Sequence, residues 1–332
     1  MPVSVFFSLT RNTFRECLRE PVFFLILAST LLLVLSFPLF TFFAFDRQIW
    51  TILESSMAAV MFLGFAAAVI CTNSCVQREM KNGTLLLLLS KPVSRFTFLL
   101  AKVTGITGAM IVFSVICCTA VMTVVLASIS PFLFDAKVML SFFGVCILCL
   151  IFGAARNYFT GASFTENTIF ALLPALPAYY AIFYSILQSR LGRMDSHDTV
   201  SLTFVNFSEQ LPVMLLLLLA IVLMGIITTA TALHFSFLSN LVFCTILFLG
   251  GLLVGPWSQA LFGSESFRGD LFSTLLPNWQ LFWMAYPVSE GTAIPLSYAG
   301  WMTLYVIAYG MIWVIWAGVT FQCTELAKDS RV

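Results

Sequence analysis

The sequence predicts an all-α fold: a polytopic membrane bundle of about eight transmembrane helices, in a single integral-membrane domain that covers residues 1–332. Two observations predict it. Hydrophobic residues make up 60% of the chain and charged residues 9%, whereas a soluble domain carries about 25% charge. The apolar residues also gather in runs of about 20, the length that a helix needs to cross a bilayer. So few charges cannot cover the surface of a soluble protein, so much of the apolar surface must face lipid.

Eight apolar runs are the expected spans, and each is expected to be a helix because backbone groups inside lipid must be hydrogen-bonded within their own segment. Pro21 suits the first turn of span one, where its missing N–H is not needed. Pro174 and Pro177 are expected to kink span five or to mark a re-entrant break. If spans four and five instead form one re-entrant hairpin, the number of crossings falls to six. Six is also an even number, so both termini still lie on the same side of the membrane. The expected spans cover residues 21–45, 51–75, 96–128, 138–155, 168–187, 211–233, 240–257 and 297–321.

Two further segments are expected to lie at the membrane surface. Residues 3–20 mix apolar residues with Arg11, Arg15 and Arg19, a pattern typical of an amphipathic helix in the cytoplasmic interface. A plain cytoplasmic extension of span one is the alternative. No small-residue cleavage site follows, so the segment is expected to be retained and not removed as a signal peptide. The outer connection 258–296 is rich in Trp and Tyr and is expected to form a short helix at the headgroup level, with an aromatic ligand box as the alternative.

The basic residues predict the orientation. Eight crossings place both termini on one side, and loops on the cytoplasmic side carry an excess of Lys and Arg. With cytoplasmic termini, eleven basic residues lie inside and five outside, so the chain is expected in the inner membrane of a bacterial cell with both ends in the cytoplasm. The inside set is Arg11, Arg15, Arg19, Arg78, Lys81, Lys91, Arg95, Lys102, Arg156, Lys328 and Arg331; the outside set is Arg47, Lys137, Arg190, Arg193 and Arg268.

The connection between spans two and three, residues 77–95, carries the most specific signal. Gly83 permits a sharp change of direction. The leucine run that follows is too short to cross a bilayer and is expected to form a buried or interfacial turn. Pro92 ends that turn, and Ser94 is placed to cap the next helix. The segment is therefore expected to be a compact cationic elbow that can dock on a soluble partner. An ordinary positive loop that only fixes topology is the alternative.

This segment resembles the ABC-2 family of transporter permeases. Family members carry Arg-Glu after the second span, then Gly-Thr-Leu and further leucines, then Ser-Lys/Arg-Pro-Val-Ser-Arg, and a Lys at the start of the third span. Two departures stand out: Leu86 occupies a position that is often acidic, and the helical pair 138–187 exceeds the usual six spans. The matching residues are Arg78, Glu79, Gly83, Thr84, Leu85, Leu88, Ser90, Lys91, Pro92, Val93, Ser94, Arg95 and Lys102.

The resemblance implies a fold, a mechanism and partners. Such permeases pair as two transmembrane subunits with two cytoplasmic ABC ATPase subunits, as homo- or heterodimers. The elbow looks like their coupling helix, which sits in a groove of the ATPase. The implied function is that of a permease subunit that moves a substrate, exported and hydrophobic in the simplest case, with energy from the separate ATPase. A non-transport membrane scaffold or anchor for an envelope complex is the alternative.

The sequence lacks the residues for chemistry of its own. No Gly-x-x-x-x-Gly-Lys-Ser/Thr motif is present, so the chain is not expected to be an enzyme or to bind a cofactor, and ATP is expected on the partner. The net charge of +1 does not point to an acidic partner, and no nucleic-acid partner is expected. Ionisable groups are nearly absent from the span centres, which argues against proton or sodium coupling. Glu54 and Lys102 lie near span ends, where their side chains are expected to reach the interface.

Cysteine and histidine do not point to a metal. Most of the nine cysteines lie in apolar runs, where cysteine behaves as a small hydrophobic residue, so no disulfide framework is expected. Cys71 and Cys75 have helical spacing, but no nearby His or carboxylate completes a tetrahedral shell. His197 and His234, the two histidines, have no catalytic or zinc-binding neighbours in the sequence. Packing, loop and interfacial roles are expected for these residues.

Overall fold

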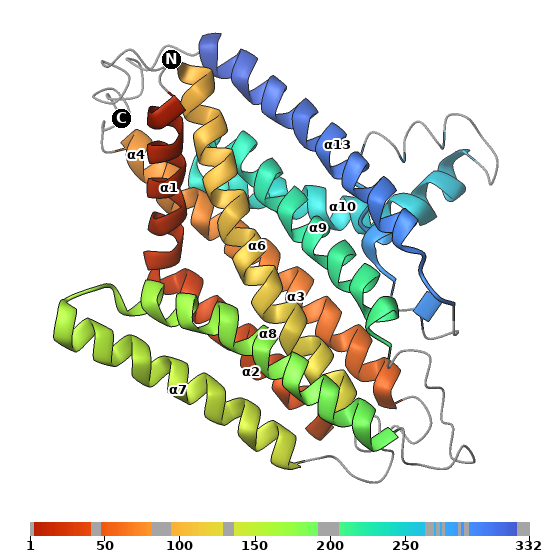
Figure 1. Cartoon of the computed structure of the whole chain (residues 1–332). Helices are drawn as coiled ribbons and strands as arrows, with labels where there is room; N and C mark the ends of the chain where they lie inside the picture. The colour runs from red at the N-terminus through yellow and green to blue at the C-terminus, as the bar shows by residue number, and fades with distance from the viewer. Residues whose placement is uncertain are drawn as a thin grey trace.

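The computed structural model describes residues 3–40, 48–81, 94–128, 136–191, 206–262, 276–284 and 292–323, with a few single positions between the last three ranges. Long helices dominate this part of the chain, and it contains no strand (Figure 1). The helices are α1 (Val3–Arg19), α2 (Pro21–Phe40), α3 (Gln48–Thr72), α4 (Arg78–Lys81), α6 (Arg95–Ala127), α7 (Ala136–Thr160), α8 (Phe164–Leu191), α9 (Phe207–Ala232), α10 (Phe237–Phe262) and α13 (Leu296–Cys323). A π-helix, η2 (Asn73–Gln77), and a 3₁₀ helix, η4 (Trp279–Phe282), complete the set.

Eight of these helices are long and apolar enough to cross a membrane, which confirms the predicted fold class. The ends agree with the predicted spans to within a few residues, apart from span one, whose predicted last residues lie outside the described ranges. α2 begins at Pro21, as predicted. α7 and α8 contain 25 and 28 residues, so each can cross the bilayer by itself. The structure therefore supports two separate spans in 138–187 and not one re-entrant hairpin.

Of the two outcomes predicted for Pro174 and Pro177, a kink in span five or a re-entrant break, the break is wrong. Pro174 and Pro177 both lie inside α8, which continues through them to Leu191. Each proline removes one backbone donor, but helices in lipid tolerate this where neighbouring groups satisfy the freed carbonyl. Fourteen residues of α8 follow Pro177, from Ala178 to Leu191, and their apolar character keeps them helical in a bilayer.

α6 lies at the centre of the bundle. In its most apolar stretch 89% of the residues are buried, against 72% in α3 and α9 and 22% in α7 and α8. α6 packs against α1, α2, α3, α8, α9 and α13, whereas α7 packs mainly against α8. The bundle therefore has a core of α3, α6 and α9, and the α7–α8 hairpin is attached to its side (Figure 1).

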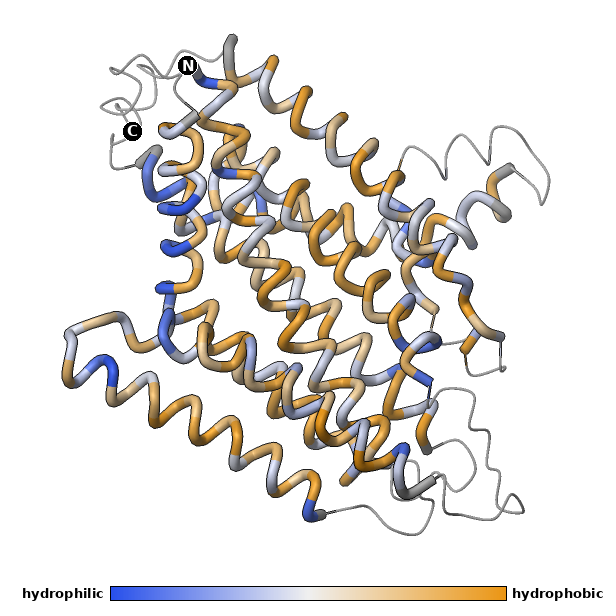
Figure 2. Tube along the Cα trace, viewed as in Figure 1, coloured by the Kyte–Doolittle hydropathy of each residue, from blue (hydrophilic) through white to orange (hydrophobic). Residues whose placement is uncertain are grey.

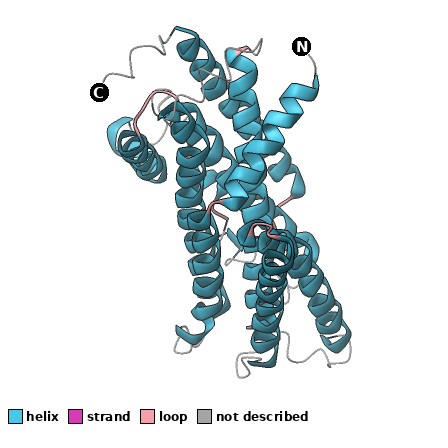
Figure 3. Cartoon of the chain, turned by 90° about the vertical axis from the view of Figure 1, so that its left-hand side faces the viewer, coloured by secondary structure: helices cyan, strands magenta, loops and turns pink. Residues whose placement is uncertain are grey.

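The helix α1 lies across one end of the bundle. It runs obliquely over the front of the molecule in Figure 3, and the polar residues of the chain are concentrated along it in Figure 2. Thr13 and Cys17 are buried on the side that faces the bundle. A Cβ at Gly105 of α6 would lie 2.7 Å from Cβ of Thr13, so the absence of a side chain there lets α1 approach closely. The predicted helix over 3–20 is thus observed, and its place in the membrane interface stays a prediction.

The α7–α8 hairpin also depends on a glycine contact. We expect Gly153→Ala to destabilise it, because the added Cβ would lie 2.0 Å from Oγ1 of Thr168 and 3.2 Å from the carbonyl oxygen of Phe164. Overpacking of this kind costs about 1–3 kcal/mol, which should lower the thermal unfolding midpoint of the purified chain in detergent. Gly144→Ala in the same helix is the control, since nothing lies within 4 Å of its Cβ. Equal midpoints for the two variants would show that the helices do not pack as described.

Candidate functional site

The structure describes both ends of the predicted coupling segment. Arg78 and Glu79 stand at its start, and Ser94 and Arg95 at its end. Gly83, Thr84, Leu85, Leu88, Ser90, Lys91, Pro92 and Val93 lie outside the described residues. The contacts that hold these two described ends define the candidate site.

The start of the segment follows a change in helix type. α3 ends at Thr72, and five residues continue as the π-helix η2 before α4 begins at Arg78. Short π-helical insertions are rare and occur frequently at functional sites. η2 is buried, and Gln77 at its end donates a 3.0 Å hydrogen bond from Nε2 to the carbonyl oxygen of Phe235. This contact ties the segment's start to the connection between α9 and α10.

Lys102 holds the start of the segment to the central helix. Its Nζ lies 2.8 Å from Oε1 of Glu79 and 3.8 Å from Oε2 of Glu16, so one ammonium group joins α4, α6 and α1. Lys102 is 3% exposed. The prediction that this side chain reaches the interface is wrong, because two carboxylates inside the protein solvate its charge instead. Arg78 and Glu20 add a 3.8 Å ion pair at the edge of the same cluster.

Glu16 is the costly member of this cluster. Burial raises the pKa of its carboxyl above the ordinary value of 4.5, and the nearby positive charge of Lys102 opposes that shift. Its buried Oε2 has no hydrogen-bond partner among the described residues, and Lys102 approaches that atom only to 3.8 Å. The negative charge of Glu16 is thus poorly solvated, and Lys102 compensates for it in part.

The end of the segment is fixed to the last helix. Oγ of Ser94 accepts a 3.2 Å hydrogen bond from the backbone N–H of Thr97, which confirms the predicted cap of α6. Nη1 of Arg95 donates a 2.9 Å hydrogen bond to the carbonyl oxygen of Phe321, and its guanidinium lies 5.7 Å from the centre of the Phe321 ring. Arg95 therefore connects the start of α6 to the C-terminal end of α13.

A buried hydroxyl cluster continues inward from η2. Oγ1 of Thr72 lies 3.2 Å from Oγ1 of Thr228 in α9, and Asn240 of α10 donates a 3.3 Å hydrogen bond to the carbonyl oxygen of Thr228. All three side chains are buried. These contacts extend the connection from the segment through α3 to α9 and α10, so a displacement of η2 would be transmitted to these three helices.

Three cysteines also meet beside the cluster. Sγ of Cys17 in α1 lies 3.2 Å from Sγ of Cys75, and the cysteine at position 71 lies close enough to hydrogen-bond Cys17. That hydrogen bond and burial raise the pKa of the Cys17 thiol well above its ordinary value. A protonated, buried thiol is a poor nucleophile and metal ligand. Within the described ranges, no group of His, Cys, Asp and Glu side chains has a metal-binding arrangement.

The structure describes part of the predicted outer connection 258–296, and a short helix, η4, is found there. Trp279 in η4 is fully buried and packs against Phe248 and Phe282, so its side chain faces the protein interior and not lipid. Close approach at Gly251 of α10 makes this possible, since a Cβ there would lie 2.1 Å from the carbonyl oxygen of Pro277. The segment around η4 is therefore packed against α10 as a short 3₁₀ helix, and its level in the membrane stays a prediction.

Sequence reasoning named Glu79 among the site residues but missed Glu16 and Glu166. Glu16 and Glu79 surround Lys102, and Glu166 lies 2.6 Å from Nε of Arg19 and 3.3 Å from Nε of Arg15. A signal was present: all three carboxylates belong to segments that the basic residues place on the cytoplasmic side, where they are outnumbered. What the sequence could not supply is the packing of α1 across α6 and α8 that brings them together.

Comparison with known proteins gives one family match. The model of a family described as ABC-2 family transporter protein matches residues 40–187, from the last residue of α2 to near the end of α8. The match includes the coupling segment, and it also covers the α7–α8 hairpin that the sequence analysis treated as an addition to the family's pattern. No curated protein and no solved structure matches the chain.

Proposed function

We propose that this chain, which belongs to the ABC-2 transporter family through residues 40–187 and is a membrane permease of an ABC transporter, takes its energy from a separate ATPase that binds residues 78–95. ATP binding and hydrolysis would occur on that partner, and this chain would supply the path through the bilayer. This chain does not need to bind a nucleotide itself, because the role of the permease is to change conformation when the ATPase does.

The observation that carries the proposal is the fixing of both ends of the segment. Glu79 at its start is paired with the buried Lys102 at 2.8 Å, and Arg95 at its end donates to the carbonyl oxygen of Phe321 at 2.9 Å. A force applied between these two points is transmitted to α1, α3, α6 and α13. A loop that only sets topology needs neither contact, since charge without structure is sufficient for orientation.

The orientation and the assembly belong to the same proposal. The ends of α3, α9 and α13 that lie beside the segment are placed in the cytoplasm, together with both termini, by the excess of basic residues on that side. The chain would then sit in an inner membrane. Two copies of the permease, or this chain with a different one, would pair with two ATPase subunits.

The interior favours an apolar cargo. Among the described residues of the eight spans, the buried ionisable side chains other than thiols and phenols are Lys102 and Glu166, and both pair with charged residues of α1, on the side that is proposed to be cytoplasmic. A pathway for ions or protons needs charged or strongly polar groups near the membrane centre. An exported hydrophobic or lipid-like substrate needs none, so it fits this interior best.

Reversal of one charge in the segment tests the proposal. The full chain, affinity-tagged, is extracted in mild detergent, and proteins that copurify are identified by mass spectrometry. A subunit with a P-loop sequence should copurify with the wild type in about equal amount, and Lys91→Glu should lower its recovery about tenfold, as expected for loss of an interface charge pair. ATP hydrolysis by the recovered complex should fall in proportion.

Lys137→Glu is the matched control. It reverses one exposed charge at the start of α7, at the opposite end of that helix from Arg156, and should leave ATPase recovery unchanged. Copurification of no P-loop protein with the wild type would reject the proposal in favour of the membrane scaffold. Equal losses in the two variants would show that residue 91 makes no specific contact.

A further inference from the structure

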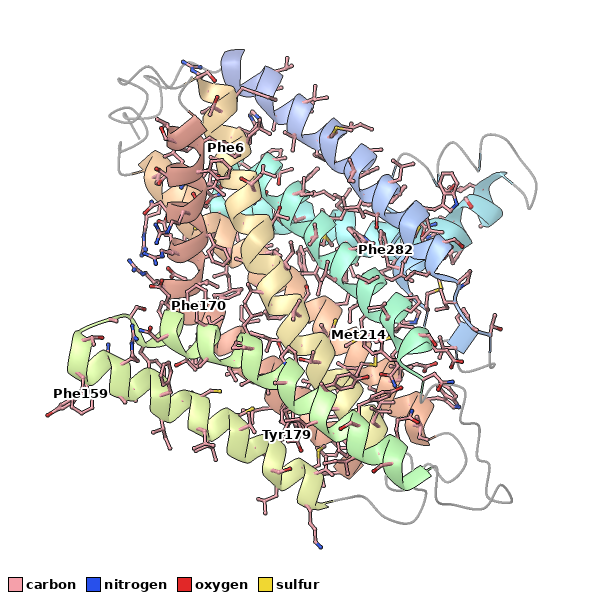
Figure 4. The ribbon with its side chains drawn as sticks, in the orientation of Figure 1. Phe6, Phe159, Phe170, Tyr179, Met214 and Phe282 are labelled. Carbon is pink, nitrogen blue, oxygen red and sulfur yellow. The ribbon has the colours of Figure 1, made fainter. Side chains whose placement is uncertain are left out.

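The outer side of α1 carries a row of three arginines. Arg11, Arg15 and Arg19 are spaced four residues apart, so they lie on one side of the helix. Arg11 is exposed, and the side chains of Arg15 and Arg19 are 42% and 54% exposed. Figure 4 shows the nitrogen-bearing side chains of α1 projecting away from the bundle. We call these three residues the basic surface.

The basic surface has more positive charge than its neighbours neutralise. Glu166 contacts both Arg15 and Arg19, and it does so through their Nε atoms. No carboxylate in the described part of the chain lies within 4 Å of Arg11. Glu166 thus neutralises one of three positive charges, and the Nη atoms of Arg15 and Arg19 are available to an outside ligand with negative oxygens.

The surroundings of the basic surface are those of a lipid contact. The turn between α7 and α8 lies on the same side of the molecule as α1 (Figure 1). Tyr158 and Phe159 beside that turn are 84% and 80% exposed. Phe7 on α1 is 64% exposed. The adjoining side of α7 is an apolar membrane span with exposed Leu148 and Ile151. A soluble acidic protein has no use for these apolar groups, whereas a phospholipid has a phosphate for the arginines and acyl chains for the apolar side.

We propose that Arg11, Arg15 and Arg19 bind the phosphate of an anionic phospholipid of the cytoplasmic leaflet, with Glu166 limiting the affinity. Glu166 orients Arg15 and Arg19 through Nε and removes one unit of positive charge from the surface. The bound lipid holds α1 at the headgroup level. Because Lys102 joins Glu16 of α1 to Glu79, the lipid also helps to fix the start of the coupling segment. This role rests on the membrane orientation of the chain and not on the identity of the ATPase.

Competition between two lipids tests this inference. The full chain is purified in detergent and mixed with equal amounts of phosphatidylglycerol and phosphatidylcholine that have identical acyl chains, and native mass spectrometry gives the ratio bound. The wild type should prefer phosphatidylglycerol. Arg11→Gln should lower that preference about fivefold, the effect of one basic residue at a membrane surface. Glu166→Gln should raise it about fivefold, a gain that damage to the fold cannot imitate.

Two controls complete the design. Arg15→Gln combined with Glu166→Gln leaves the net charge of the basic surface unchanged and should keep the wild-type preference. Lys137→Gln removes one positive charge at the other end of α7 and should also have no effect. Equal effects of Lys137→Gln and Arg11→Gln, no gain from Glu166→Gln, or displacement of the lipid by inorganic phosphate at millimolar concentration would each overturn the inference.

Discussion

Replacement of Lys102 by methionine should destabilise the chain by about 3–5 kcal/mol, the cost of leaving a buried charge without its partner. Lys102 is 3% exposed and joins Glu79 at 2.8 Å to Glu16 at 3.8 Å. Methionine keeps the length and the apolar stem but leaves two carboxylates in a region with little water. The expected result is a lower thermal unfolding midpoint in detergent and a loss of ATPase recovery, because the start of the coupling segment is released.

The pH dependence of this effect distinguishes charge from packing. Burial raises the pKa of Glu16 above 4.5, so the folded state holds that proton more tightly than the unfolded state does. Ionisation of Glu16 therefore costs stability, and its contribution falls as the pH rises from the unfolded value through the raised folded value. Without Lys102 the folded pKa should rise further, so the deficit of Lys102→Met should shrink as the pH is lowered toward 4.5.

Neutral partners provide the controls. Lys102→Met with Glu16→Gln and Glu79→Gln removes every charge of the group and should recover most of the loss. Glu16→Gln alone should be neutral or stabilising above pH 4.5, because the poorly solvated carboxylate is gone while the pair between Lys102 and Glu79 remains. A deficit of Lys102→Met that is independent of pH, and that the triple variant does not relieve, would show that Lys102 acts through its shape.

Gly251→Ala should displace the segment around η4 from the outer end of the bundle. The new Cβ would lie 2.1 Å from the carbonyl oxygen of Pro277 and 2.5 Å from Nε1 of Trp279, so backbone has to move. Overpacking against backbone costs about 3 kcal/mol, and the fully buried Trp279 would become accessible. The measurements are the thermal unfolding midpoint, which should fall, and the rate of limited proteolysis in the connection 258–296, which should rise.

Gly250→Ala is the adjacent control. Nothing lies within 4 Å of a Cβ at that position, and alanine favours a helix over glycine by about 1 kcal/mol. This variant should therefore be as stable as the wild type or slightly more stable, with unchanged proteolysis. Both variants make the same change, glycine to alanine, at adjacent positions, so a difference between them reports the local packing. Equal unfolding midpoints and proteolysis rates for the two variants would contradict the packing of Pro277 on α10.

The sequence was sufficient to predict the number, order and helical nature of the spans. Length and apolar composition decide these features in lipid, where every backbone group must be satisfied within its helix. The caps were also readable: Pro21 begins α2, and Ser94 caps α6. Pro174 and Pro177 misled, because their effect depends on whether neighbouring helices compensate for the missing donors, and a sequence does not reveal which helices are neighbours.

The site was predicted only in part for a similar reason. Arg95 and Lys102 were recognised as members of a family pattern, but their partners, the carbonyl of Phe321 and the carboxylate of Glu16, are distant in the chain. Trp279 was assigned to a headgroup belt because aromatic residues prefer that level. Gly251, whose lack of a side chain makes room for Trp279, lies 28 residues earlier in the chain. Only the three-dimensional packing brings the two residues together.

The π-helix at Asn73–Gln77 has a consequence for how related sequences are to be aligned. One additional residue in a helical turn rotates everything after it by about 100°. Glu79 faces Lys102 in this chain with that rotation in place. In a relative whose second span runs on as an uninterrupted α-helix, the carboxylate that meets the lysine would belong to a neighbouring position, so an ungapped alignment through residues 73–77 would pair residues that do not occupy the same place.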